Sequence, residues 1–144
     1  MKTDLMLEES ITINTCTEKV WEALTDPKKI KHYLFNADTF TDWEIGSPII
    51  FTGSFNDFKF YSKGEVLEFR PGAILKYTYF NSPEGYADIP DNYTVITYTI
   101  TKINEESVKL THKREHIPSE KEKKNSRQFL LEMLKQLKAI AEKN

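Results

Sequence analysis

A chain of 144 residues is long enough to bury one sizeable core, and 39% hydrophobic with 29% charged residues is ordinary for a globular domain. The formal net charge of −2 gives no electrostatic reason to expect a nucleic acid as partner. No apolar run approaches the roughly 18 residues of a membrane span, and the N-terminal residues lack the apolar stretch of a signal peptide. The single cysteine, Cys16, excludes an internal disulfide and favours a reducing compartment. We therefore expect one domain over residues 1–144, located in the cytoplasm.

The N-terminal segment predicts one strand followed by two short helices. Apolar and polar residues alternate from Leu7 to Ile13, which is typical of a strand. Thr15-Cys16-Thr17-Glu18 has the form of a capping box, in which the first and last side chains satisfy free backbone N–H groups at a helix start. Asp26 can cap a second helix, and Pro27 suits its first position because proline has no backbone N–H to satisfy. This second helix should run to about Tyr33.

The long segment after these helices predicts a run of strands. Its apolar residues recur with period two, and turn residues separate the alternating stretches. The predicted strands cover 48–55, 58–69, 73–80, 93–103 and 106–114. Arg70-Pro71-Gly72 and Asn104-Glu105-Glu106 predict tight turns between consecutive strands. The connection 81–92, with two prolines and one glycine, predicts an exposed loop.

The C-terminal residues predict one long amphipathic helix over about 119–142. Ser119-Glu120-Lys121-Glu122 has the form of another capping box, and apolar residues then recur at spacings of three and four from Phe129 to Ala141. Such a stripe must be buried, and the upstream sheet is its partner. The order of elements therefore predicts an α+β fold: a curved antiparallel sheet of six or seven strands wrapped around a long C-terminal helix, with two short helices after the first strand.

The alternation within each strand also indicates which side chains face the helix. On the strand 93–103 these are Ile96, Tyr98 and Ile100, with threonines on the solvated face. The same reasoning places Ile49 and Leu75 inward on their strands. Together with the apolar side of the helix, the inward residues predict a ligand-binding space lined by Phe51, Tyr77, Tyr79, Ile96, Tyr98, Leu110, His112, Arg114, Phe129, Met133 and Leu137.

Two polar side chains on this inward face, His112 and Arg114, allow two interpretations. A buried histidine or arginine is costly unless it is paired or wetted. In one interpretation both lie at a strand end, reach solvent and pair with Glu115 or Glu68. In the other they orient the polar end of a small, largely apolar ligand, and neighbouring tyrosines provide apolar walls with a hydroxyl group. If the tyrosines are instead ordinary core residues, the protein itself should satisfy their hydroxyls.

Several short stretches, in their order and spacing across nearly the whole chain, resemble one family. They are Ile11-Thr12-Ile13, the run from Glu18 to Pro27, Gly64-Glu65-Val66-Leu67-Glu68, Leu75-Lys76-Tyr77-Thr78-Tyr79, Val108-Lys109-Leu110-Thr111-His112 and Leu134-Lys135-Gln136-Leu137-Lys138. The chain resembles the START-like (SRPBCC) helix-grip superfamily and, within it, the homologues of the activator of the heat-shock-protein-90 ATPase. This resemblance implies a helix-grip fold with a hydrophobic cavity between the sheet and the C-terminal helix. It does not identify the ligand.

Sequence motifs of catalysis and metal binding are absent. The chain has no H-E-x-x-H, C-x-x-C, Walker-type glycine loop or G-x-S-x-G. Its histidines, His32, His112 and His116, do not have metal-ligand spacing with one another or with Cys16. We therefore expect no catalytic residue, no metal and no cofactor.

The leading hypothesis is a non-enzymatic protein that binds or carries a small hydrophobic or amphipathic molecule, with no nucleic acid as partner and no membrane span. Two alternatives stay open. Some relatives implied by the resemblance are cyclase- or hydrolase-like enzymes, and such an enzyme would need an acid or base among His112, Arg114, Glu68 and the tyrosines. The family name also suggests a co-chaperone-like interaction protein, although nothing in the sequence supports a protein partner.

Overall fold

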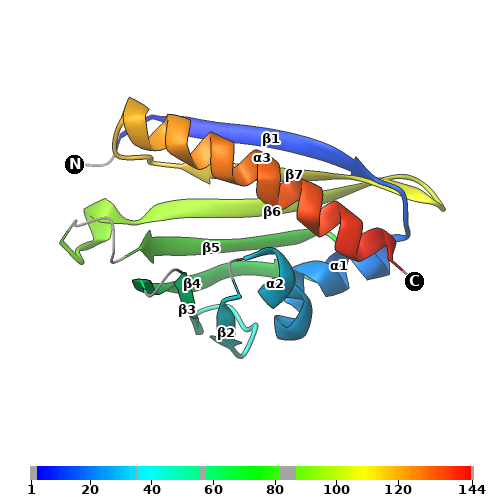
Figure 1. The fold of residues 1–144 in the computed structure, drawn as a ribbon, viewed down its shortest axis with the longest axis horizontal. Helices are drawn as coiled ribbons and strands as arrows, with labels where there is room; N and C mark the ends of the chain where they lie inside the picture. Colours follow the sequence, from blue (N-terminus) through cyan, green and yellow to red (C-terminus); the bar gives the residue numbers. More distant parts are fainter. Residues whose placement is uncertain (1–2, 35, 56–57, 82–86, 144) are drawn as a thin grey trace.

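The computed structural model of the chain describes residues 3–34, 36–55, 58–81 and 87–143. Its elements, in chain order, are β1 (Met6–Ile13), α1 (Thr17–Thr25), α2 (Pro27–Tyr33), β2 (Asp38–Thr41), β3 (Pro48–Phe55), β4 (Phe58–Arg70), β5 (Ile74–Asn81), the short 3-10 helix η2 (Pro90–Asn92), β6 (Thr94–Asn104), β7 (Ser107–Glu115) and α3 (Glu120–Glu142). Within these ranges the strands form one antiparallel seven-stranded sheet in the order β1-β7-β6-β5-β4-β3-β2 (Figure 1). No helix in the described ranges is long and apolar enough to cross a membrane.

The predicted α+β helix-grip fold is confirmed. Figure 1 shows α3 lying across the sheet, with α1 and α2 near its C-terminal end. The two short helices lie between β1 and β2, as the order of sequence patterns predicts. The alternation does not single out β2, because four residues are too few to establish a period of two. The first strand pairs with the last, β7, and β2 ends the other side of the sheet.

Helix starts follow the predicted caps in two places and differ in a third. The Ser119 hydroxyl accepts a hydrogen bond from the backbone N–H of Glu122 at 3.2 Å, and the Asp26 carboxylate caps α2 in the same manner at 3.0 Å. The capping box predicted from Thr15 is wrong, because the N-cap of α1 is Cys16 and, within the described residues, its side chain makes no capping hydrogen bond. A thiol is a weak acceptor, and Thr15 lies one position too early to be the cap.

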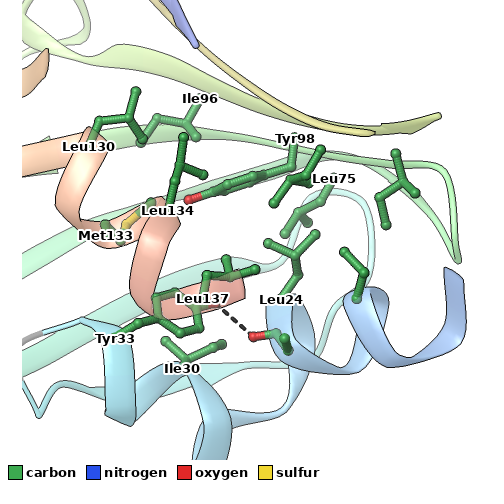
Figure 2. Close-up of a cluster of buried hydrophobic side chains, with 14 of the residues drawn as sticks. Leu24, Ile30, Tyr33, Leu75, Ile96, Tyr98, Leu130, Met133, Leu134 and Leu137 are labelled. Atoms are coloured by element: carbon green, nitrogen blue, oxygen red, sulfur yellow. Dashed lines mark hydrogen bonds between the residues drawn. The ribbon is translucent and has the colours of Figure 1, made fainter. Parts of the chain in front are cut away.

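The core lies between the inner face of the sheet and α3. Ile96, Tyr98 and Ile100 of β6 are all buried, as their alternation predicts. On the other side, α3 buries one stripe: Leu130, Met133, Leu134, Leu137 and Ala141. Figure 2 shows Leu130, Met133, Leu134 and Leu137 of this stripe meeting side chains of the sheet and of both short helices. The helix is therefore held by the sheet along its length and by α1 and α2 at one end.

Candidate functional site

A pocket of about 380 Å³ lies between the sheet, the two short helices and one side of α3. Most of the residues predicted to line a binding space do line it: Phe51, Tyr77, Tyr79, Ile96, Tyr98, His112, Arg114, Phe129 and Met133. Figure 2 shows Ile96 and Tyr98 of β6 opposite Leu130 and Met133 of α3. The volume falls within the range of roughly 300–1,000 Å³ that is usual for small-molecule sites.

Two predicted residues, Leu110 and Leu137, do not line this pocket. Both are fully buried in the closed part of the core. Leu110 lies on β7 between Ile11 of β1 and Ile100 of β6. Leu137 lies one helical turn beyond Met133, and along α3 the pocket extends only as far as Met133. The sequence pattern identifies their inward faces but not where along each element the pocket ends.

Sequence reasoning missed further lining residues, some on elements that it had not assigned to the pocket and others on β5 and α3. They are Leu7, Leu24, Ile30, Tyr33, Leu34, Trp43, Asn81, Glu122, Asn125, Ser126 and Leu130, and Ile49 and Leu75 also line the pocket. On α3 a signal was present. Glu122, Ser126, Phe129 and Met133 are spaced by four, three and four residues, so the inward side of the helix continues toward its N-terminus in polar residues.

Arg114 lies at the polar end of the pocket, where β7 approaches the first turns of α3. Its Nε donates a hydrogen bond to Thr94 Oγ1 of β6 at 3.1 Å, and its Nη1 donates to Ser126 Oγ of α3 at 2.8 Å. The guanidinium carbon also lies 5.5 Å from the centre of the Tyr79 ring, which is a cation–π distance. The side chain therefore ties β6, β7 and α3 together beside the pocket.

His112 lies deeper on the same strand, and only 6% of the residue is exposed. Its ring packs edge-on against Tyr98, with the ring centres 4.8 Å apart and the planes at 84°. No described residue hydrogen-bonds to its Nδ1. Burial, and to a lesser degree the charge of Arg114, lowers the pKa of His112 to about 3, so the imidazole is neutral at pH 7. The interpretation in which His112 reaches solvent is wrong, and Glu68 forms an ion pair with Arg70 at 2.7 Å instead.

Three tyrosines at the pocket, Tyr33, Tyr77 and Tyr98, keep their hydroxyl protons at neutral pH. Tyr33 donates a hydrogen bond to a backbone carbonyl of α1 at 2.7 Å, and Tyr79 donates to Ser62 Oγ at 3.1 Å. Burial raises the pKa of Tyr33, Tyr77 and Tyr98 well above the usual value for a phenol. The walls therefore combine apolar surface with neutral hydrogen-bonding groups, and toward the N-terminus of α3 they carry the Arg114 guanidinium and the Glu122 carboxylate.

A second, smaller pocket of about 250 Å³ lies between α2 and α3. Tyr33, Phe129 and Met133 line both pockets, so these side chains lie between the two spaces. Among the described residues, no group of three histidine, cysteine, aspartate or glutamate side chains is arranged to hold a metal ion.

Comparison with known proteins identifies a family and a relative with a known structure. The family model described as activator of Hsp90 ATPase homolog 1-like protein matches residues 14–142. A protein of Cytophaga hutchinsonii with a known solution structure is 35% identical, the match covers 99% of this chain and 97% of that one, and the TM-score is 0.82. None of the curated proteins matches the sequence.

Two further solved structures resemble the chain at lower identity. An Hsp90 activator from Plasmodium falciparum is 17% identical, with 79% of this chain and 74% of that one covered and a TM-score of 0.63. CalU16 from Micromonospora echinospora is 16% identical, with 92% of this chain and 71% of that one covered and a TM-score of 0.70. At such identities the likeness shows the fold alone.

Proposed function

The chain belongs to the activator of Hsp90 ATPase homolog 1-like family, and we propose that it binds or carries one small hydrophobic or amphipathic molecule between the sheet and α3, without catalysing a reaction. The observation that carries this proposal is the pocket itself. Its volume of about 380 Å³ suits a small molecule, and its walls are mostly aliphatic and aromatic. We also propose a cytoplasmic location, because the single cysteine suits a reducing compartment.

The two ends of the pocket differ in character, which supports one orientation of the ligand. Toward the short helices the walls include Leu24 and Ile30, both buried and apolar. Toward the N-terminus of α3 they include Arg114, Glu122, Asn125 and Ser126. An amphipathic molecule would gain most by placing its apolar body against the short helices and its polar end near the guanidinium.

Two measurements test whether the protein binds a small molecule. Native mass spectrometry of freshly purified protein should show one additional small-molecule mass that is lost on denaturation. Protein freed of that molecule should bind the fluorescent probe 1-anilinonaphthalene-8-sulfonate saturably and with one-to-one stoichiometry. A protein that purifies without a ligand and shows no saturable probe binding would refute the proposal.

A matched pair of arginine variants tests the orientation. Arg114→Ala should weaken binding of this anionic probe about tenfold or more, because hydrogen bonds to charged groups are among the stronger ones. Arg70→Ala should leave binding unchanged, because the Arg70 side chain is 67% exposed on β4 and does not line the pocket. Equal effects of the two substitutions would show that the probe is not oriented by the pocket's guanidinium.

The enzyme alternative, a cyclase- or hydrolase-like activity on the same fold, requires a general acid or base beside the substrate. His112 lines the pocket, but a pKa of about 3 makes it a weak base at pH 7. In an enzyme, His112→Ala should abolish turnover far more than it weakens binding. In the binding protein that we propose, the same substitution should change affinity alone.

A second candidate function is interaction with a chaperone. The family description and the likeness to the Plasmodium falciparum Hsp90 activator favour it. Its test is the ATPase rate of Hsp90 with and without the protein. If the protein raises the ATPase rate of Hsp90, and variants with substituted pocket residues raise it equally, the protein acts as an interaction protein. An unchanged ATPase rate would remove this candidate.

A further inference from the structure

A residue of the pocket wall, His112, has one buried ring nitrogen, Nδ1, that no described residue satisfies. His112 is 94% buried, lines the pocket, and has no hydrogen-bond partner for Nδ1 among the described residues. Native proteins satisfy the large majority of their buried polar atoms, with protein groups or with bound water or ligand. His112 lines the pocket, but Nδ1 itself has almost no exposed surface, so a group in the pocket can become its partner only if the ring turns to present this nitrogen.

The surroundings of His112 fix where its ring can go. On β7 the residue lies opposite Glu9 of β1 and Tyr98 of β6 in the hydrogen-bonded sheet, so its backbone cannot shift without breaking the ladder. The ring packs edge-on against Tyr98 with centres 4.8 Å apart. Rotation of the imidazole ring by 180° about its Cβ–Cγ bond exchanges the positions of Nδ1 and Cδ2, and the ring then occupies nearly the same volume. The imidazole can therefore offer a nitrogen to the pocket but cannot swing out to solvent.

A neutral imidazole carries one donor and one acceptor. It can hydrogen-bond a hydroxyl through its acceptor nitrogen or a carbonyl through its N–H, but it offers no positive charge to an anion. Tyr98, against which the ring packs, is buried and uncharged as well, and the same pocket is lined by the buried residues Tyr77 and Ile96. An ionised carboxylate placed against His112 would lose its hydration, which is costly, and its nearest positive charge would be the Arg114 guanidinium, which already donates hydrogen bonds to Thr94 and Ser126.

We propose that the ligand carries an uncharged hydroxyl or carbonyl group that hydrogen-bonds to His112, so that His112 selects an apolar alcohol or ketone over the corresponding hydrocarbon or carboxylate. This inference rests on the proposed function, since it concerns the ligand of the same pocket. It differs from the role of Arg114, whose guanidinium lies two residues further along β7 and toward the polar end.

Three probes of one shape test this selection: naphthalene, 2-naphthol and 2-naphthoate, the second of which is uncharged at pH 7. Dissociation constants are measured for the wild-type protein, for His112→Phe and for the control His32→Phe, whose residue is exposed on α2. The quantity compared between variants is the dissociation constant of 2-naphthol divided by that of naphthalene. The hydration of each free probe is the same in every measurement, so it does not contribute to the change in this ratio from one variant to another. His112→Phe should raise this ratio about two- to tenfold, the range of one neutral hydrogen bond. His32→Phe should leave it unchanged.

A second measurement uses the wild-type protein alone and so does not depend on the variant folding. The imidazole nitrogens of His112 should shift in a nitrogen-15 spectrum when 2-naphthol is added and should shift much less with naphthalene. An unchanged ratio in His112→Phe, equal shifts with both probes, or tightest binding of 2-naphthoate would each overturn the inference. If the probes bind without dependence on His112, the proposed function stands and only this inference fails. If none of the three probes binds, this inference fails, and the proposed function fails with it only where the protein also lacks a co-purified ligand and saturable binding of 1-anilinonaphthalene-8-sulfonate.

Discussion

Replacing Leu130 and Leu137 of α3 with alanine makes the same chemical change in two different surroundings. Both leucines are buried, at 3% and 0% exposure, and they lie two turns apart on one side of the helix (Figure 2). Leu130 lines the pocket, whereas Leu137 does not. The pair therefore separates the loss of packed core from the widening of a space that is already present.

The structure gives a different expected cost for each substitution. Leucine-to-alanine changes in cores cost about 2.7–5.0 kcal/mol, and the cost grows with the volume of the cavity left behind. Leu137→Ala opens a new closed cavity, so we expect about 3–5 kcal/mol. The atoms of Leu130 that face the pocket have few contacts to lose, so we expect about 2–3 kcal/mol. Met133→Ala should resemble Leu130→Ala, because Met133 lies between two pockets.

Urea denaturation monitored by circular dichroism measures these costs. With a slope of roughly 2 kcal/mol per molar urea, a difference of about 1–2 kcal/mol between the two leucine variants separates their midpoints by about 0.5–1 M. The comparison requires equal slopes, since a changed slope would indicate a changed denatured state. A Leu130→Ala variant that loses as much stability as Leu137→Ala, or more, would show that Leu130 lies in closed core and would refute the pocket geometry.

Three further predictions follow from the described contacts. Between about pH 6.5 and pH 3 the unfolded chain binds a proton at His112 that the folded protein excludes, so stability should fall with decreasing pH by up to roughly 1.4 kcal/mol per unit. In urea titrations at each pH, His112→Phe should reduce this slope, and an unchanged slope would contradict the buried, neutral imidazole. A Cβ at Gly64 would overlap a backbone carbonyl of β5, so Gly64→Ala should lower stability by roughly 2 kcal/mol or more, and wild-type stability would contradict the close approach. Trp43 lines the pocket and Trp21 does not, so Trp43→Phe should abolish a ligand-induced change in fluorescence that Trp21→Phe retains.

The strands could be predicted closely because each is long and is bounded by turn residues. The segment predicted as 48–55 is β3 without change, and the other long strands begin or end within one residue of the prediction. Gly72 adopts a φ of 79° in the turn after β4, a left-handed conformation that glycine reaches without strain. Local chemistry of this kind is readable from neighbouring residues. Such patterns predict the strands of the sheet, and the apolar stripe of α3 predicts that this helix packs on the sheet.

The part of the site contributed by the short helices could not be predicted in the same way. Leu24 and Ile30 reach the pocket only because α1 and α2 pack at a particular angle against the end of α3, and no periodicity encodes that angle. Trp43 lies in the connection between β2 and β3 with a φ of 60°, where the chain has neither helical nor strand periodicity. These positions depend on tertiary packing, so they require the structure.

The polar end of the pocket, by contrast, follows from topology once two patterns are read together. On β7 the inward residues change from apolar at Leu110 to polar at His112 and Arg114 as the strand approaches its end. On α3 the inward residues change in the opposite direction, from polar at Ser126 to apolar at Met133. Because the chain passes from the end of β7 to the start of α3 through only a few residues, the two polar ends must meet. The 2.8 Å hydrogen bond from Arg114 to Ser126 joins the two polar ends. The polar groups therefore lie at one end of the pocket, and the other end is apolar.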